Sequence, residues 1–150
     1  MRFDFETYKS QIRDLRKDYD ALCGEFEETI PLDNKILQDC LKNQITMQMK
    51  FNELYSELYH WHENAKTDVE ELYSLRYQVL IDDSYKGYSA TEAKQIAMSD
   101  TNYLQMKRIY NNFHALLSSM NELNDLLETR KYTLKTISDS MINGINKHII

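Results

Sequence analysis

The sequence predicts an all-α protein: an elongated helical bundle or coiled-coil hairpin of long helices, completed by oligomerisation. The 150 residues include only three glycines and one proline, so few turns are available for a sandwich or barrel. Apolar residues recur at gaps of three and four over long stretches, which is the period of a helix face. We expect one all-helical domain over residues 1–150, with helices at about 3–27, 33–82, 90–98 and 100–143.

The first expected helix carries a heptad seam, in which apolar gaps alternate between three and four residues. This spacing keeps one stripe of the helix facing a partner helix. The seam consists of Phe5, Tyr8, Ile12, Leu15, Tyr19, Leu22 and Phe26. Pro31 prevents a smooth continuation of the helix.

The second expected helix begins at Asp33, which can cap it, and runs to about residue 82 without Gly or Pro. Its seam repeats every seven residues at Phe51, Leu58, Ala65, Leu72 and Val79, with Leu54, Trp61 and Leu75 on the second position. Asp68 interrupts the second row, and a stripe of tyrosines lies beside the seam. A wide apolar face of this kind is typical of a helix that contacts more than one neighbour.

A helix of this length would span roughly 70 Å, whereas a compact globule of this size would be about 40 Å across. Either the helix kinks or the protein is elongated. Because an elongated protein with apolar seams usually completes its core with other subunits, we expect a homo-oligomer.

A short third helix and a long fourth one are expected after a connecting loop. Ser89 and Glu92 form a capping box, Gly87 can adopt positive φ, and Ser99 and Asp100 offer a second cap. The fourth helix has a seam at Ile109, Phe113, Leu116, Met120, Leu123, Leu127, Leu134, Ile137 and Met141.

Arg130 is the one charge on the seam of the fourth helix. A lone charge at such a position can specify register or oligomeric state. The alternative is a helix break near Arg130 that frees Arg130 and Lys131 to face water. The sequence leaves both interpretations open.

Several classes of function find no support in the sequence. No apolar run approaches the roughly 18 residues that span a membrane, and the N-terminus lacks the core of a signal peptide. Cys23 and Cys40 form no CxxC pattern and fit a reducing cytosol. We expect a cytoplasmic protein with no membrane partner.

The sequence also lacks the motifs of an enzyme. It has no nucleophile elbow, P-loop or dinucleotide-binding turn. Glu57 and His60 have the spacing of one half of a di-iron site, but no second such pair exists. His60 and His62 point to different helix faces. We therefore expect no catalysis, no cofactor and no metal site.

Charge and aromatic residues favour nucleic-acid binding by the second half of the chain. Residues 1–83 carry a net charge of −8 and residues 84–150 a net charge of +2. Single-stranded nucleic acid is held by basic grooves and by aromatic faces that stack on bases. The candidate contacts are Arg76, Tyr77, Tyr85, Lys86, Tyr88, Lys94, Lys107 and Arg108, with Arg130 and Lys131 further along. The alternative is that Tyr77 packs in the bundle while Tyr85 and Tyr88 cover a helix end.

Three elements between residues 70 and 143 resemble those of a known family. Glu92, Lys94, Ser99 and Asp100 match a Glu-x-Lys segment that leads into a Ser-Asp helix start, and Arg130, Tyr132, Leu134, Lys135 and Ile137 loosely match an Arg-aromatic-Ile-Lys-x-Ile element. Arg76 matches the arginine of a Lys-x-Arg element, with Ser74 in place of its lysine. These elements resemble the UvsY-like family of tailed-phage recombination mediators; a related small phage helical protein is the other relative considered.

The resemblance implies a ring-forming protein in the host-cell cytoplasm that binds single-stranded DNA. Its implied partners are a phage recombinase and a single-strand binding protein, which the recombinase displaces with help from the mediator. The alternative hypothesis is a helical adaptor or inhibitor that binds a host or phage protein and no DNA. Neither hypothesis involves covalent chemistry.

Overall fold

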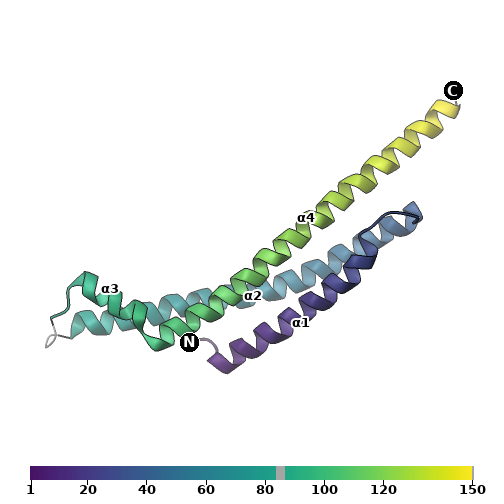
Figure 1. The fold of residues 1–150 in the computed structure, drawn as a ribbon. Coiled ribbons are helices and arrows are strands. Elements are labelled where there is room, and N and C mark those ends of the chain that lie inside the picture. Colours follow the sequence, from purple (N-terminus) through teal and green to yellow (C-terminus); the bar gives the residue numbers. More distant parts are fainter. Residues whose placement is uncertain (84–86, 150) are drawn as a thin grey trace. The chain divides into compact units, whose positions relative to one another are not determined.

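The computed structural model describes residues 1–83 and 87–149, with side chains through residue 144. These residues form four helices and no strand, so the predicted all-α class is confirmed (Figure 1). The helices are α1 (Phe5–Thr29), α2 (Leu37–Asp82), α3 (Ala90–Ser99) and α4 (Thr101–Ile149). None of these described helices combines the length and apolar character that crossing a bilayer requires.

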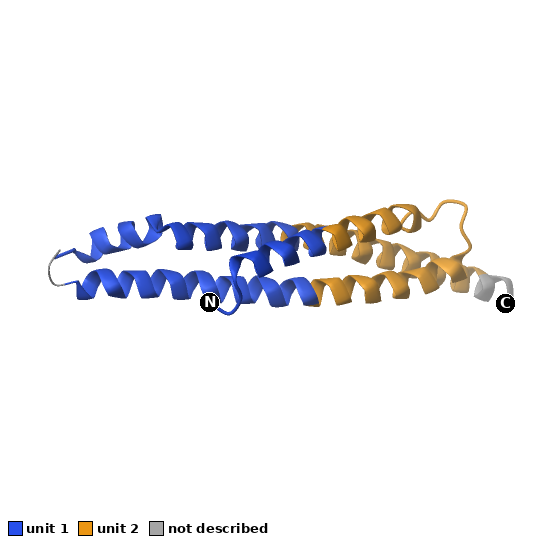
Figure 2. Cartoon of the chain, turned by 90° about the horizontal axis from the view of Figure 1, so that it is seen from below, with its two compact units in different colours: residues 1–16, 57–117 blue, residues 17–56, 118–150 orange. Residues whose placement is uncertain are grey.

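The chain divides into two compact units (Figure 2). Unit 1 comprises Met1–Arg16 and Glu57–Leu117, and unit 2 comprises Lys17–Ser56 and Ser118–Ile150. Helices α1, α2 and α4 each contribute a segment to both units, whereas α3 belongs to unit 1.

The core of unit 1 contains an aromatic cluster where α1, α2 and α4 meet. The ring of Tyr8 is fully buried and makes edge contacts with Trp61 at 5.9 Å and Phe113 at 6.1 Å between centroids. Phe3 packs against Trp61 with centroids 4.7 Å apart. Ile12 and Leu15 are buried as well, so the predicted α1 seam faces the core in this unit.

Asp68, which interrupts the predicted apolar row of α2, is a buried acceptor that fixes the start of the chain. Its carboxylate accepts hydrogen bonds from the Tyr8 hydroxyl and from the Arg2 backbone N–H at 2.9 and 3.0 Å. Burial, and then the hydrogen bond to Asp68, raises the pKa of Tyr8 well above its usual range. A buried carboxylate needs such donors, because an unpaired buried charge is strongly destabilising.

The second half of α2 departs from the predicted seam. Leu75 and Val79 are 65% and 58% exposed, whereas Val69 and Leu80 are buried. A straight α-helix drifts about 20° per heptad away from a strict seven-residue repeat. The buried face therefore moves along α2 from the predicted row onto the neighbouring row that contains Leu80.

That neighbouring row packs against α3. Leu80, Ala93 and Ala97 form a small buried cluster, against which Tyr73, Tyr77, Tyr88 and Ile96 pack. The predicted caps are present: the Ser89 hydroxyl accepts from the Glu92 backbone N–H at 3.2 Å, and the Asp100 carboxylate accepts from the Tyr103 N–H at 3.1 Å. Gly87 has a φ of 57°, as a tight helix entrance requires.

The connection between α1 and α2 is longer than predicted. Helix α1 ends at Thr29, because the residue before Pro31 is disfavoured in helical conformation. Helix α2 begins at Leu37 rather than Asp33, because Asn34 adopts a left-handed conformation with a φ of 58°. The Asp33 cap was therefore a wrong prediction.

Arg130 lies inside unit 2, with only 4% of its surface exposed. Its guanidinium donates to the carbonyls of Thr29, Ile30 and Cys40 at 3.1–3.3 Å and to the Gln44 side-chain oxygen at 2.7 Å. Burial lowers the pKa of Arg130. Because α4 is unbroken from Thr101 to Ile149, the alternative interpretation of a helix break near Arg130 is excluded.

Candidate nucleic-acid interface

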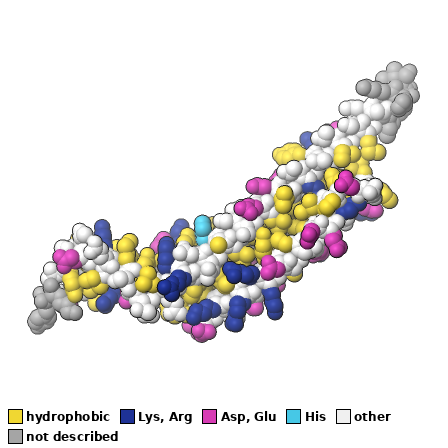
Figure 3. Space-filling view, viewed as in Figure 1, with side chains coloured by type: hydrophobic (Ala, Val, Ile, Leu, Met, Phe, Trp, Pro, Cys, Tyr) yellow, Lys and Arg dark blue, Asp and Glu magenta, His cyan; other side chains and the backbone are white. Residues whose placement is uncertain are grey.

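A groove with basic side chains lies between α1 and α4 in unit 1. It has a volume of about 390 Å³ and continues into an adjoining hollow of about 300 Å³. We call the two together the basic groove; they are lined by Glu6, Lys9, Ile12, Arg13, Thr101, Leu104, Gln105, Arg108, Ile109 and Asn112. Figure 3 shows Lys and Arg side chains gathered over the beginnings of α1 and α4.

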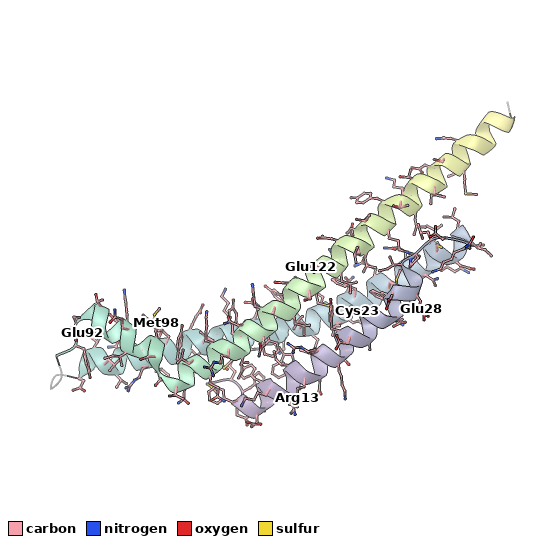
Figure 4. The ribbon with its side chains drawn as sticks, in the orientation of Figure 1. Arg13, Cys23, Glu28, Glu92, Met98 and Glu122 are labelled. Atoms are coloured by element: carbon pink, nitrogen blue, oxygen red, sulfur yellow. The ribbon has the colours of Figure 1, made fainter. Side chains whose placement is uncertain are left out.

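Helical spacing places the groove's cations on facing surfaces. Lys9 and Arg13 are four residues apart and share one face of α1, and Arg108 projects from α4. Figure 4 shows Arg13 on the first half of α1. Lys9 pairs with Glu6 at 3.5 Å in an exposed contact, which is worth little to stability. Within the described part of the chain, Arg13 and Arg108 form no salt bridge, so both guanidinium groups can bind an anion.

A cluster of aromatic rings lies on the other side of α4, where α4 packs against α2. We call it the aromatic platform; it consists of Tyr59 and His62 from α2 and Tyr110 and His114 from α4. The centroids of successive rings are 5.0–6.4 Å apart. His114 and Tyr59 are exposed and Tyr110 is half-buried, so the platform offers aromatic faces to solvent.

Two lysines flank the aromatic platform. The Lys107 ammonium lies 5.0 Å from the centre of the Tyr110 ring, within the range of a cation–π contact. Lys66 and Lys107 line a hollow of about 150 Å³ with Val69, Glu70 and Tyr110. Lys107 and Arg108 are adjacent in sequence, so α4 presents a cation to the platform and another to the basic groove.

The structure brings together only some of the residues that the sequence suggested. Lys107 and Arg108 lie at the surface just described. Lys94 is exposed on α3, and Arg76 is exposed on α2 with its Nε 3.8 Å from an Asp100 oxygen. Lys131 is exposed in unit 2 and lines a different groove.

Three of the suggested residues that the structure describes, Tyr77, Tyr88 and Arg130, have side chains packed against other parts of the chain. Tyr77 and Tyr88 are half-buried against the cluster of α3, as the alternative interpretation expected. Tyr85 and Lys86 lie outside the described residues. The prediction that Arg130 contacts nucleic acid is wrong, because its guanidinium is buried and donates to protein oxygens.

The sequence prediction did not include Lys9 and Arg13, because it compared only the net charges of residues 1–83 and 84–150. Residues 1–17 carry five basic and three acidic side chains, whereas residues 18–33 carry six acidic and no basic ones. A count along the first helix would have shown that its first half is basic.

Unit 2 leaves apolar side chains exposed. A groove of about 620 Å³ between α2 and α4 includes Leu41, Ile45 and Leu134. A second hollow of about 510 Å³ lies between α1 and α4, and Cys23 and Glu122 are among its lining residues (Figure 4). Beyond Leu134 the predicted α4 seam is open to solvent, with Ile137 38% and Met141 54% exposed.

The fold is similar to that of a solved phage recombination protein. The crystal structure of the bacteriophage T4 recombination mediator protein UvsY matches this chain with a TM-score of 0.64. The two are 20% identical, and the match covers 83% of this chain and 97% of that chain. No protein-family model and no curated protein sequence matches the chain. The likeness to UvsY-like proteins that the sequence indicated is confirmed at the level of the fold.

Proposed function

We propose that this chain is a phage-type recombination mediator that binds single-stranded DNA and assists recombinase loading. The observation that supports it most is that the first part of α4 carries the basic groove on its α1 side and the aromatic platform on its α2 side. Single-stranded DNA needs both features, because cations bind its phosphates and aromatic rings stack on its bases. The fold shared with the T4 mediator agrees with this function.

In the proposed mode of binding, Lys9, Arg13 and Arg108 contact successive phosphates. Bases stack at the exposed His114 end of the aromatic platform, each stacked base contributing about 1–3 kcal/mol. Lys107 lies between the two regions and contacts the backbone as the strand crosses α4. Arg76, Lys94 and Lys131 remain predicted contacts outside this surface.

The proposed mechanism involves competition and protein contact without covalent chemistry. The protein occupies DNA that a single-strand binding protein would cover and presents that DNA to a recombinase, in the host-cell cytoplasm. Several copies held together would turn weak individual sites into high avidity, because a second site binds at a raised effective concentration.

We further propose that the chain forms a homo-oligomer in which a second copy of the chain covers the exposed apolar residues of unit 2. Ile45 is 65% exposed beside a groove that includes Leu41 and Leu134, and the same seam continues to Met141. Sedimentation equilibrium is expected to give a mass of several chains, and Ile45→Glu is expected to lower it because a carboxylate resists burial. A monomer mass at every concentration would contradict this assembly.

Titration of fluorescent oligo-dT tests the proposed function. Binding is expected at about 50 mM salt and should weaken steeply toward about 200 mM, because cations bound to the DNA are released when phosphates are neutralised. A protein of unchanged helicity that shows no binding at the lower salt would contradict the proposal. The adaptor hypothesis would then be favoured, with the apolar surface of unit 2 as the interface.

A further inference from the structure

Two histidines from different helices meet in unit 1. His62 Nε2 on α2 lies 3.2 Å from His114 Nδ1 on α4, although the residues are 52 positions apart in the chain. His62 is buried at 6% exposure, whereas His114 is exposed, so the gap between the two nitrogens is at the edge of the core. The other nitrogen of His62, Nδ1, lies 3.2 Å from Glu63 Oε1.

The Glu63 carboxylate decides which nitrogen of His62 can bind a ligand. A carboxylate only accepts hydrogen bonds, so its contact with Nδ1 favours the tautomer that carries the proton there. The lone pair of His62 is then on Nε2 and faces His114. Without an ion, His114 Nδ1–H donates to this lone pair at 3.2 Å; when the His114 proton moves to Nε2, both lone pairs can bind one ion.

The spacing of these two nitrogens suits a shared metal ion. Transition metals bind imidazole nitrogen at about 2.0–2.1 Å, which puts two adjacent ligands about 2.9–3.4 Å apart in tetrahedral or octahedral geometry. The observed 3.2 Å lies within that range. A carboxylate on the far nitrogen is the usual partner of a metal-binding histidine, since it orients the ring and raises its basicity.

We propose that His62 Nε2 and His114 Nδ1 bind one divalent transition-metal ion of the Ni²⁺, Cu²⁺ and Zn²⁺ class. Glu63 orients His62, and water fills the remaining positions. Among the residues that the structure describes, no group of three or more His, Cys, Asp or Glu could hold a metal, so this site has two protein ligands.

The bound ion would link α2 to α4 within the aromatic platform, to which both histidines belong. The sequence expectation of no metal site tested His114 only as part of a second Glu-x-x-His pair, which Asn111 excludes, and did not pair it with His62 on another helix. His114 also belongs to the proposed stacking surface, so metal binding is measured without DNA, and its outcome does not depend on whether the chain binds DNA.

Isothermal titration of the full chain with NiCl₂ in metal-free buffer tests the site. The wild type is expected to bind one ion, and His114→Ala is expected to bind it at least about tenfold more weakly. Glu63→Gln leaves both ligands in place and is expected to lower the affinity about 10–100-fold. His60→Ala is the matched control, because His60 is exposed on the same helix two residues from His62 and should bind Ni²⁺ as the wild type does.

Thermal unfolding with and without Ni²⁺ gives a second readout. The ion binds only the folded pair, so it should raise the unfolding midpoint of the wild type and of His60→Ala, but not of His114→Ala. The proposal is overturned if His114→Ala, with unchanged helicity by circular dichroism, binds Ni²⁺ like the wild type. It is also overturned if His60→Ala loses as much affinity as His114→Ala. Should His114→Ala fail to fold, wild-type affinity in Glu63→Gln overturns it.

Discussion

Arg130→Ala is expected to lower the free energy of unfolding by about 3–5 kcal/mol, because it strands several buried hydrogen-bond acceptors. The guanidinium binds the carbonyls of Thr29 and Ile30, which the end of α1 leaves without helical partners. It also binds the Cys40 carbonyl and the Gln44 side chain, whose own amide donates to the Leu127 carbonyl at 3.0 Å. Alanine removes all these donors and leaves a cavity.

Urea unfolding followed by circular dichroism measures this effect. The matched control is Lys131→Ala, the next residue on α4, whose side chain is exposed. An exposed substitution of this kind usually changes stability by no more than about 0.5 kcal/mol. Similar stability losses in the two variants would show that Arg130 does not hold unit 2 together.

Arg13→Ala combined with Arg108→Ala is expected to weaken oligo-dT binding about tenfold or more at low salt. The two guanidinium groups lie on opposite walls of the basic groove, and each can contact a phosphate. Both side chains are exposed, so the fold should survive their removal. Fluorescence titration of oligo-dT measures the affinity, with circular dichroism as the check on folding.

Lys17→Ala combined with Lys42→Ala is the matched control for this variant. It removes the same net charge, and both lysines are exposed in unit 2, outside the basic groove. If charge alone attracted DNA, the two double variants would bind equally weakly. A specific groove predicts near wild-type affinity for the lysine variant.

Most of the buried positions of α1, and of α4 as far as Leu134, could be predicted from the spacing of apolar residues. A seam depends on local spacing, and buried positions such as Tyr8, Phe113 and Leu127 follow directly from it. The second half of α2 could not be predicted in this way, because the drift of a straight helix and the position of α3 decide which row is buried. Leu75 and Val79 have the right spacing but no partner to cover them among the described residues.

The candidate site could be predicted only in part. Lys107 and Arg108 were found because they are adjacent and lie in a basic stretch. Lys9 and Arg13 join them only through the packing of α1 on α4, which no local pattern shows. Composition also does not distinguish a tyrosine that stacks on a base from one that packs in the protein core. Tyr77 packs against the buried cluster of Leu80, Ala93 and Ala97.

The salt dependence of oligo-dT binding tests most directly whether the basic groove binds the DNA backbone. Each phosphate of a single strand that the protein neutralises steepens the slope of log affinity against log salt by about 0.7. The slope is therefore expected to be shallower by about 1.4 in Arg13→Ala/Arg108→Ala than in the wild type, and unchanged in Lys17→Ala/Lys42→Ala. Equal slopes in the wild type and the arginine variant would contradict a phosphate-binding groove between α1 and α4.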